Sequence, residues 1–528
     1  MQRMCASASV QALHRAIGTK HPLDHISCGQ GGVSLRQKIP IFYNALMLTG
    51  VNLLLRFVST SFQVYISGKI GPAGVGLLQL VLSVGAMAMT TGMAGVRTAT
   101  MYLTAEELGK KRPQNVIWVL SGSVLYSILC SSAVAACVYF SAPFLANVWI
   151  GNADTVGAIR LLAGFIPVNC LCGVMTGYFT AANRISTLAA VEVAEQMLYM
   201  AVTMTALTVW AGSNSALACS CVVLGSGISA CVTLVTLMVL RVRERQKHGA
   251  RIPIRSRLLH TAVPLAIADD FRTGISTTEN LMVPKRLALF GGVDAPLAAF
   301  GMVCGMVFPV LMFPAAILFG LAELLIPELA RCAAAGSKTR IDYLVRRSLK
   351  VALLYGCCFC GLMFLLAGDL CIWLYQNARA GAQLRLYATL IPVLYCDAIT
   401  DAMTKGLGQQ KACVRYNIIT SSMDVAFLYL LLPKYGMSGY FFSFLVTHLL
   451  NFGLSLRRLL KISGSKLPLH VPLTSIIATV AAIFAGANFS APALKAGAFL
   501  VCFSCLLFLF QVLSKEDILW LKGLVKAT

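Results

Sequence analysis

The chain has 528 residues, of which 58% are apolar and only 12% are charged, and its formal net charge is +23. This composition excludes a soluble globular protein, because the water-exposed surface of a chain of this length needs far more charge. The basic excess does not indicate a nucleic-acid partner either, since the charges lie in short loops between apolar runs. Each run has about 20 residues, enough to span a bilayer as a helix, so we predict an all-α, polytopic membrane protein.

A polar stretch, residues 1–35, comes first and lacks the apolar core of a signal peptide. We expect either a cytoplasmic tail or a wrongly assigned start site. Residues 36–245 follow and form a predicted N-lobe of six helices. Its spans are expected at roughly 41–66, 76–98, 116–140, 156–180, 186–210 and 215–240.

Two arginines in this lobe are candidates for binding an anionic substrate. Arg56 lies near the middle of the first span, too deep to reach the interface easily, so it either faces a substrate or belongs to a structural ion pair. Arg97 lies near the inner end of the second span, where its long side chain can instead extend to the interface.

The most basic loop runs from Arg241 to Arg257, between the sixth and seventh spans. With the N-terminus placed inside, most of the 43 lysines and arginines fall on that same side. Cytoplasmic loops carry such an excess, so we predict that both ends are cytoplasmic and that the chain resides in the cytoplasmic membrane. The loop is either a topology signal that also attracts anionic lipid or a specific partner site.

Residues 246–461 form a predicted C-lobe, with spans near 258–284, 296–320, 348–375, 384–405, 413–433 and 438–456. The first of these spans is the most polar in the chain, with Asp269, Asp270, Arg272 and Glu279. Helical spacing places Asp269 and Arg272 on one face. The group is either an ion or proton site in a cavity wall, with Arg272 available to a substrate, or an internally neutralised contact between helices.

Further carboxylates lie in the tenth and eleventh spans, at Asp397, Asp401 and Asp424. Hard cations such as sodium require several oxygen ligands, which these spans can supply, although each carboxylate can equally be structural. Residues 462–528 contain two more spans, 470–488 and 493–513, which brings the prediction to fourteen helices in two six-helix lobes plus a C-terminal pair.

Motifs of catalysis are absent from the sequence. It contains no HExxH, no nucleotide-binding glycine loop and no nucleophile elbow, and most of the 19 cysteines lie within apolar runs without metal-type spacing. We therefore expect no enzyme activity, no cofactor and no nucleic-acid partner. Without a phosphate-binding loop, any energy source must be an ion gradient such as Na⁺ or H⁺, the membrane potential or a metabolic sink.

Several segments resemble the polysaccharide exporters of the multidrug/oligosaccharidyl-lipid/polysaccharide (MOP) flippase superfamily, and more narrowly the stage V sporulation protein B branch, which is related to the lipid II flippase. The resemblance covers roughly residues 33–515, in the order that the family shows. The segments are Asn44 to Arg56, Gly68 to Gln79 with Gly71-Pro72-Ala73-Gly74-Val75-Gly76, Gly173 to Phe179, Pro264 to Leu287, Pro314 to Glu328, and Lys405 to Gln409.

The resemblance implies two six-helix lobes that open a central cavity alternately to each side, with two extra helices that form a groove for a lipid tail. By position, Arg56 matches a first-span cavity arginine that engages a diphosphate, and Arg272 is the best candidate in the seventh span. Asp269, Asp270 and Asp424 are the nearest equivalents of a proposed ion site. The chain departs from the family at Phe62 and Gln63, where relatives often carry another basic residue. The superfamily also implies a monomer.

These observations favour a transporter that flips a lipid-linked saccharide, a peptidoglycan or polysaccharide precursor, between membrane leaflets. A cation-coupled multidrug antiporter is the alternative, although cationic drugs favour carboxylates over Arg56 in the first lobe. A membrane-embedded enzyme has little support from short external loops and a single well-embedded histidine, His448. A scaffold has little reason to keep charges in hydrocarbon.

Overall fold

The computed structural model describes residues 35–110, 112–212, 214–242, 254–292, 295–465, 468 and 470–513. Every regular element in these ranges is helical, which confirms the all-α prediction. The predicted tail up to residue 34 and most of the basic loop, residues 243–253, lie outside the described residues.

The chain divides into two compact units, and each is described by itself. Residues 1–59 and 77–282 make up the first unit, and residues 60–76 and 283–528 the second. These divisions fall within predicted spans one and seven and at the start of span two. The predicted boundary between the lobes, by contrast, lies between residues 245 and 246. The predicted lobes therefore remain a prediction, and the compact units are not identical to them.

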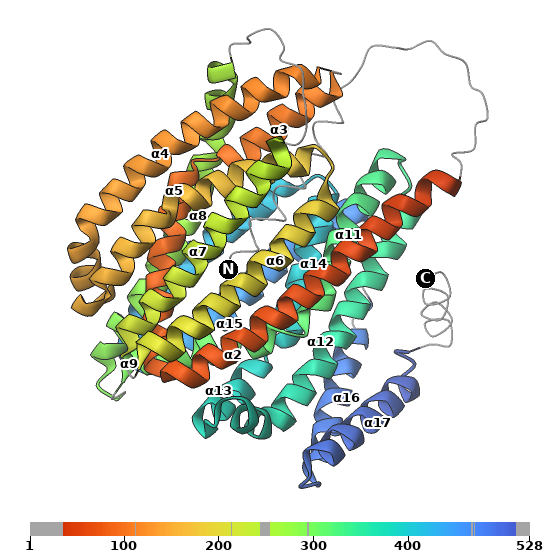
Figure 1. The fold of residues 1–528 in the computed structure, drawn as a ribbon. Helices are drawn as coiled ribbons and strands as arrows, with labels where there is room; N and C mark the ends of the chain where they lie inside the picture. Colours follow the sequence, from red (N-terminus) through yellow and green to blue (C-terminus); the bar gives the residue numbers. More distant parts are fainter. Residues whose placement is uncertain are drawn as a thin grey trace, which may run out of the picture. The chain divides into compact units, whose positions relative to one another are not determined.

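The first unit is a bundle around a core of apolar side chains from α3, α4, α5 and α7, among them Val96, Leu120, Tyr178 and Leu237. Figure 1 shows α4, α5 and α7 side by side in this bundle. The helices of this unit are α2 (Leu35–Met93), α3 (Val96–Gly109), α4 (Val116–Phe144), α5 (Val156–Ala181), α6 (Ile185–Ala206), α7 (Ser215–Val242) and α8 (Ile254–Leu287). Part of α2 and the end of α8 belong to the second unit.

The second unit contains a core formed by α12, α16 and α17, with Leu365, Ala482, Phe499 and Phe503. Figure 1 shows α16 and α17 as a pair next to α12. The helices of the second unit are α9 (Pro296–Met302), α10 (Phe308–Met312), α11 (Ala315–Ala334), α12 (Lys338–Tyr375), α13 (Ala378–Ala388), α14 (Ile391–Gly406), α15 (Gln410–Ser463), α16 (His470–Ala487) and α17 (Pro492–Leu509).

The segment of α2 that belongs to the second unit is fixed by close backbone contact. A Cβ atom on Gly301 of α9 would lie 2.1 Å from the carbonyl oxygen of Pro72, so only glycine permits this approach. Further along, Gln63 and Ser67 donate hydrogen bonds to the carbonyl oxygen of Gly305. Gln63 therefore has a hydrogen-bond partner within the second unit.

Each of the fourteen predicted spans falls in a helical region, and eight helical regions are by themselves long and apolar enough to cross a membrane. The number rises to ten if two bent pairs each count as one span. Those pairs bend by 62° just before Ala315 and by 54° just before Ile391, next to Pro314 and Pro392, because proline interrupts the hydrogen bonds of a helix. The chain is therefore a multi-pass membrane protein. The charge-bearing helices α6 and α8 are not among the eight.

Candidate functional site

A stripe of four polar side chains follows one face of the second half of α15. Ser443, Thr447, Asn451 and Ser455 are spaced by four residues, so they lie one helical turn apart on the same side. All four are at most 5% exposed. In an apolar environment such groups need hydrogen-bond partners, and the partners identify the site.

Two of these partners are the predicted carboxylates of α14, Asp397 and Asp401, which lie one turn apart. The side-chain amide of Asn451 donates to both carboxylate oxygens of Asp397, at 3.0 Å each. The hydroxyl of Ser455 donates to Asp401 at 3.0 Å, and Asn417 of α15 donates to its other oxygen at 3.3 Å. Each carboxylate is therefore held between two helical segments.

The third carboxylate, Asp424, belongs to the first half of α15. The helix breaks at Gly436, whose φ of 57° and ψ of −137° are not helical, and the chain then folds back on itself. This reversal brings Asp424 to the hydroxyl of Ser443, which donates a short hydrogen bond to it, and to that of Thr447 at 3.4 Å. Asp424 is 7% exposed.

We refer to these three carboxylates and the four residues of the stripe as the carboxylate ladder. Two basic side chains of the described residues lie near these carboxylates: the Lys405 ammonium is 3.6 Å from Asp401, and Nδ1 of His448 is 3.9 Å from Asp397. The side-chain oxygen of Asn451 is buried and accepts no hydrogen bond. The ladder thus has more negative than positive groups, together with one open oxygen acceptor.

This arrangement suits protons or a single monovalent cation better than a divalent metal. Within the described ranges, no three His, Cys, Asp or Glu side chains converge as a metal site would require. Instead, each carboxylate has neutral hydroxyl or amide neighbours, the kind of oxygen set that hard cations prefer. The predicted ion-coupling residues Asp397, Asp401 and Asp424 are therefore brought to one helix face.

The polar face of α8 has a different environment, within the first unit. Asp270 accepts a hydrogen bond from Thr91 at 3.1 Å, and Thr273 donates to Thr90 at 3.4 Å. One and two turns further, Thr277 donates to the Ser83 carbonyl at 3.2 Å and Asn280 to the Ser83 hydroxyl at 3.0 Å. We call this row the α2–α8 contact.

The same antiparallel register continues past the end of α2. Gly95 lies directly against the backbone of Ala262 in α8. Arg257 then forms ion pairs with Glu106 at 2.7 Å and with Glu107 at 3.0 Å. Along this contact, the residue numbers of α2 and α3 increase by about as much as those of their partners on α8 decrease, as expected for antiparallel helices. Asp270 therefore takes part in a contact between helices, and an ion-coupling role for it stays a prediction.

Asp269, Arg272 and Glu279 also belong to α8, and they are not among the residues of the four hydrogen bonds that define the α2–α8 contact. Asp269 and Arg272 are close enough to interact electrostatically, as their spacing predicts, and Arg272 is exposed. Glu279 is half-buried, about two turns beyond Arg272 toward the C-terminal end of the helix. The structure therefore separates the six predicted ion-coupling residues into three in each unit.

The predicted substrate arginines all belong to the first unit. Arg56 is half-buried on α2 and Arg272 is exposed on α8. Arg97 is half-buried at the start of α3, where its backbone carbonyl approaches Gly177 of α5, and its Nε atom is buried without a hydrogen bond. The Gly173–Gly177 pair thus provides close packing for the helix that carries Arg97.

The polar stripe of α15 was not among the predicted site residues. Its signal was present, because Ser443, Thr447, Asn451 and Ser455 repeat every four residues within an apolar span. The fold-back at Gly436 and the pairing with α14, by contrast, are tertiary features that no local pattern specifies.

Comparisons with known proteins show what this chain is similar to. Residues 49–205 match the family model MatE. Stage V sporulation protein B of Bacillus subtilis (strain 168) is 21% identical over 411 residues, which cover 75% of this chain and 78% of that protein. Among solved structures, the lipid II flippase MurJ in an inward closed conformation has a TM-score of 0.65 at 11% identity, covering 90% of this chain and 100% of that one.

A multidrug resistance MATE family transporter of the MOP superfamily, in an inward-facing conformation, has a TM-score of 0.61 at 12% identity. That match covers 80% of this chain and 99% of the transporter. The chain thus has the fold of these transporters.

Proposed function

We propose that this chain, of which residues 49–205 match the family model MatE, is a member of the MOP flippase superfamily and a flippase for a lipid-linked saccharide. The observation that carries the proposal is the extent of structural likeness. The likeness to the lipid II flippase covers 90% of the chain, whereas the likeness to the multidrug transporter covers 80%. The sporulation protein, matched over three quarters of the chain, supports the same choice.

The cargo proposed is an undecaprenyl-type lipid joined through a diphosphate to a glycan, a precursor of peptidoglycan or of an exported polysaccharide. Arg56, Arg97 and Arg272 are the residues proposed to bind the diphosphate. A guanidinium group donates two parallel hydrogen bonds to a phosphate, which suits recognition in a polar cavity. The buried Nε of Arg97 is a donor that no described residue uses.

The carboxylate ladder is proposed to couple flipping to an ion gradient, with Asp397, Asp401 and Asp424 as the titrating or ligating groups. Carboxylates are costly in hydrocarbon, by about 2.5–3.5 kcal/mol each even on lenient insertion scales. The gradient ion, Na⁺ or H⁺, would relieve that cost when it binds. Asp269, Asp270 and Glu279 form a second, separate group for which coupling is a weaker proposal, because Asp270 already joins α8 to α2.

The setting proposed is the cytoplasmic membrane with both termini on the cytoplasmic side, as the distribution of basic residues predicts. The partners are the lipid-linked glycan and surrounding membrane lipids, and the chain acts as a monomer. The orientation is tested by fusing to the C-terminus a fluorescent protein that matures only in the cytoplasm. The fusion should be fluorescent if the C-terminus is cytoplasmic.

The function itself is tested by reconstituting the full chain in liposomes and following a fluorescent undecaprenyl-diphosphate glycan between leaflets. Arg56→Ala and Arg272→Ala should each reduce the rate at least tenfold. Arg160→Ala is the matched control, since Arg160 is exposed on α5 and stacks 5.3 Å from the centre of the Tyr139 ring. Unchanged rates in both variants would keep the function but overturn the arginine assignment. No movement by wild type, with extrusion of a cationic dye instead, would favour the multidrug alternative.

A further inference from the structure

The start of α8 is joined to the end of α3 by a cluster of charged side chains that the proposed function does not use. One terminal nitrogen of Arg257 lies 2.7 Å from a carboxylate oxygen of Glu106, and the other lies 3.0 Å from a carboxylate oxygen of Glu107. All three residues belong to the first unit. A single guanidinium group therefore holds two anionic groups at once, one on each side of its fork.

Each glutamate also has a local partner on its other oxygen. The Lys110 ammonium donates to Glu106 at 2.5 Å, and the Asn115 amide donates to Glu107 at 2.9 Å. All four carboxylate oxygens of the pair are therefore engaged, two by Arg257 and two by residues next to α3. We call these five residues the α3–α8 latch.

The latch lies at the edge of a buried apolar contact between the same helices. Leu258 and Ala262 of α8 share one apolar cluster with Leu103 of α3, and each is at most 2% exposed. That apolar contact has no group that a polar ligand could bind. The latch supplies one, because the side chain of Arg257 is 36% exposed.

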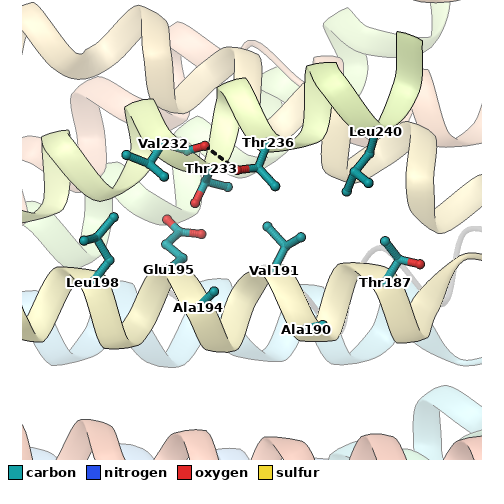
Figure 2. Close-up of a pocket in the computed structure, with 10 residues that line it drawn as sticks. All are labelled: Thr187, Ala190, Val191, Ala194, Glu195, Leu198, Val232, Thr233, Thr236 and Leu240. Atoms are coloured by element: carbon teal, nitrogen blue, oxygen red, sulfur yellow. Dashed lines mark hydrogen bonds between the residues drawn. The ribbon is translucent and has the colours of Figure 1, made fainter. Parts of the chain in front are cut away.

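The burial of Glu107 connects its ion pair to the contact between the helices. Glu107 is 3% exposed, so its charge needs either a cationic partner or water. If Arg257 binds another anion, the end of α3 must separate from α8 before water can reach Glu107. Glu195 of α6 differs, because it points into a groove whose ten lining residues include no lysine or arginine (Figure 2). That groove thus offers no ion pair that an anion could exchange.

We propose that a diphosphate group replaces Glu106 and Glu107 on Arg257 and thereby releases the α3–α8 latch. The two glutamates place two negative charges on one guanidinium, and a diphosphate that links a lipid to a saccharide carries two as well. In the latched state, the glutamates occupy the position of the diphosphate and keep α8 against α3. The identity of the cargo rests on the proposed function. The exchange is a separate step, about four turns of α8 before Arg272.

The charge of the latch favours a diphosphate over the phosphate of an ordinary membrane lipid. The phosphodiester of phosphatidylglycerol carries one negative charge, so it compensates for the loss of only one glutamate. Arg257 also ends the most basic loop of the chain, which begins at Arg241 and attracts anionic groups to this end of the first unit. The distribution of basic residues predicts that this end is cytoplasmic.

The test measures binding of geranyl diphosphate to the full chain in phosphatidylcholine nanodiscs. The double variant Glu106→Gln with Glu107→Gln keeps the side-chain shapes but removes the competing charges, so its Kd should be at least tenfold lower. Arg257→Gln should raise the Kd at least tenfold, and in that background the two glutamine substitutions should change it less than twofold. An unchanged Kd in the double variant would overturn the proposal, and so would an equal gain without Arg257.

A matched variant separates the exchange from a general effect of negative charge. Glu328 also pairs with two arginines, with Arg340 at 2.6 Å and with Arg331 at 3.6 Å, but it belongs to the second unit. Glu328→Gln should therefore change the Kd less than twofold, and a tenfold gain from it would reject the latch.

Three further ligands identify the group that is recognised. Geranyl monophosphate should gain less than threefold from the double variant, and an equal gain would reject a site for two anionic groups. Phosphatidylglycerol in the nanodiscs should not compete, and competition would overturn the choice of a diphosphate. Inorganic pyrophosphate should compete only at a concentration at least tenfold higher than geranyl diphosphate. Equal competition would reject a lipid-linked ligand.

Release of the latch is measured on the wild-type chain by hydrogen–deuterium exchange, so this readout does not depend on how the variants fold. Geranyl diphosphate should accelerate exchange of the backbone amides of residues 258–266 at least fivefold, because this part of α8 loses its contact with α3. Unchanged exchange at a saturating concentration would overturn the release.

These outcomes are distinguishable from failure of the proposed function, because neither binding nor exchange requires transport. Glycan movement in liposomes without the expected binding pattern would reject the latch and keep the flippase. The expected binding pattern without glycan movement would keep the latch and reject the flippase.

Discussion

A line of polar side chains runs through the described helices of each unit, and the two lines differ in charge. The α2–α8 contact of the first unit consists mainly of hydroxyl and amide groups, with Asp270 as its carboxylate. The carboxylate ladder of the second unit sets three aspartates against one face of α15. The first line joins helices through mostly neutral hydrogen bonds. The second places several negative charges in apolar surroundings, where each charge is unfavourable in free energy.

This difference indicates which polar residues in a membrane helix are structural. Hydrogen bonds between membrane helices contribute about 0.6 kcal/mol on average, and up to roughly 1.7 kcal/mol, so neutral pairs act as modest attachments. Three carboxylates in apolar spans, with Asp424 buried and Asp397 and Asp401 half-buried, would destabilise the fold unless they were compensated, and the ladder has Lys405 as a close cation. The comparison therefore supports the proposal that the first line attaches helices and the second couples ions, and four substitutions test it.

The largest effect is expected from Asp397→Asn. The substitution removes a charge but keeps the side-chain shape beside Asn451. Gradient-driven flipping in liposomes should fall about 100-fold, because the coupling ion loses a ligand or a proton acceptor. Thermal stability in detergent should stay the same or increase, since a buried charge is gone. A stable variant with wild-type, gradient-dependent flipping would refute the coupling role, and loss of stability would indicate a structural ion pair instead.

Asn451→Leu tests the same pair in the complementary way. It leaves the charge of Asp397 and removes the amide group that donates two hydrogen bonds to this carboxylate. Hydrogen bonds to a charged group contribute about 1.5–3 kcal/mol, so the free energy of unfolding should fall by an amount in that range. The double variant Asp397→Ala with Asn451→Leu should recover part of this loss. Additive losses in the double variant would show that the two side chains do not depend on each other.

Much of the fold could be predicted from the sequence, because a membrane-spanning backbone must satisfy its hydrogen bonds within its own helix. Apolar runs therefore identify each span, and Pro314 and Pro392 mark where two spans bend. Asp397, Asp401 and Asp424 could be selected as candidates because charges in apolar runs are rare.

The partners of those carboxylates could not be predicted in the same way. Ser443 meets Asp424 only because α15 reverses at Gly436, and Asn451 meets Asp397 only because α14 packs beside it. The helical spacing of Asp269, Asp270 and Arg272 left a site and a helix contact equally open. The structure gives Asp270 a partner in Thr91, which spacing within one helix cannot reveal.

Gly436→Ala disturbs the carboxylate ladder without changing a polar group. Its φ of 57° lies in the left-handed region, and a Cβ atom there would lie 2.8 Å from the ring of Phe290. The backbone conformation alone should cost about 1–2 kcal/mol of stability. Gly453→Ala is the matched control on the same helix, where a Cβ atom would meet nothing within 4 Å. Equal thermal stability of the two variants would contradict the proposed reversal at Gly436.

The smallest effect is expected from Thr277→Val, in the α2–α8 contact. The substitution keeps the side-chain shape and removes the donor to the Ser83 carbonyl. Stability should fall by about 0.6 kcal/mol, the average for a hydrogen bond between membrane helices, because the α2–α8 register is also held by the neighbouring pairs. Flipping should change less than twofold, as measured in the same liposomes as Asp397→Asn. A flipping defect as large as that of Asp397→Asn would abolish the distinction between the two lines, because a neutral attachment would then matter as much as a charge.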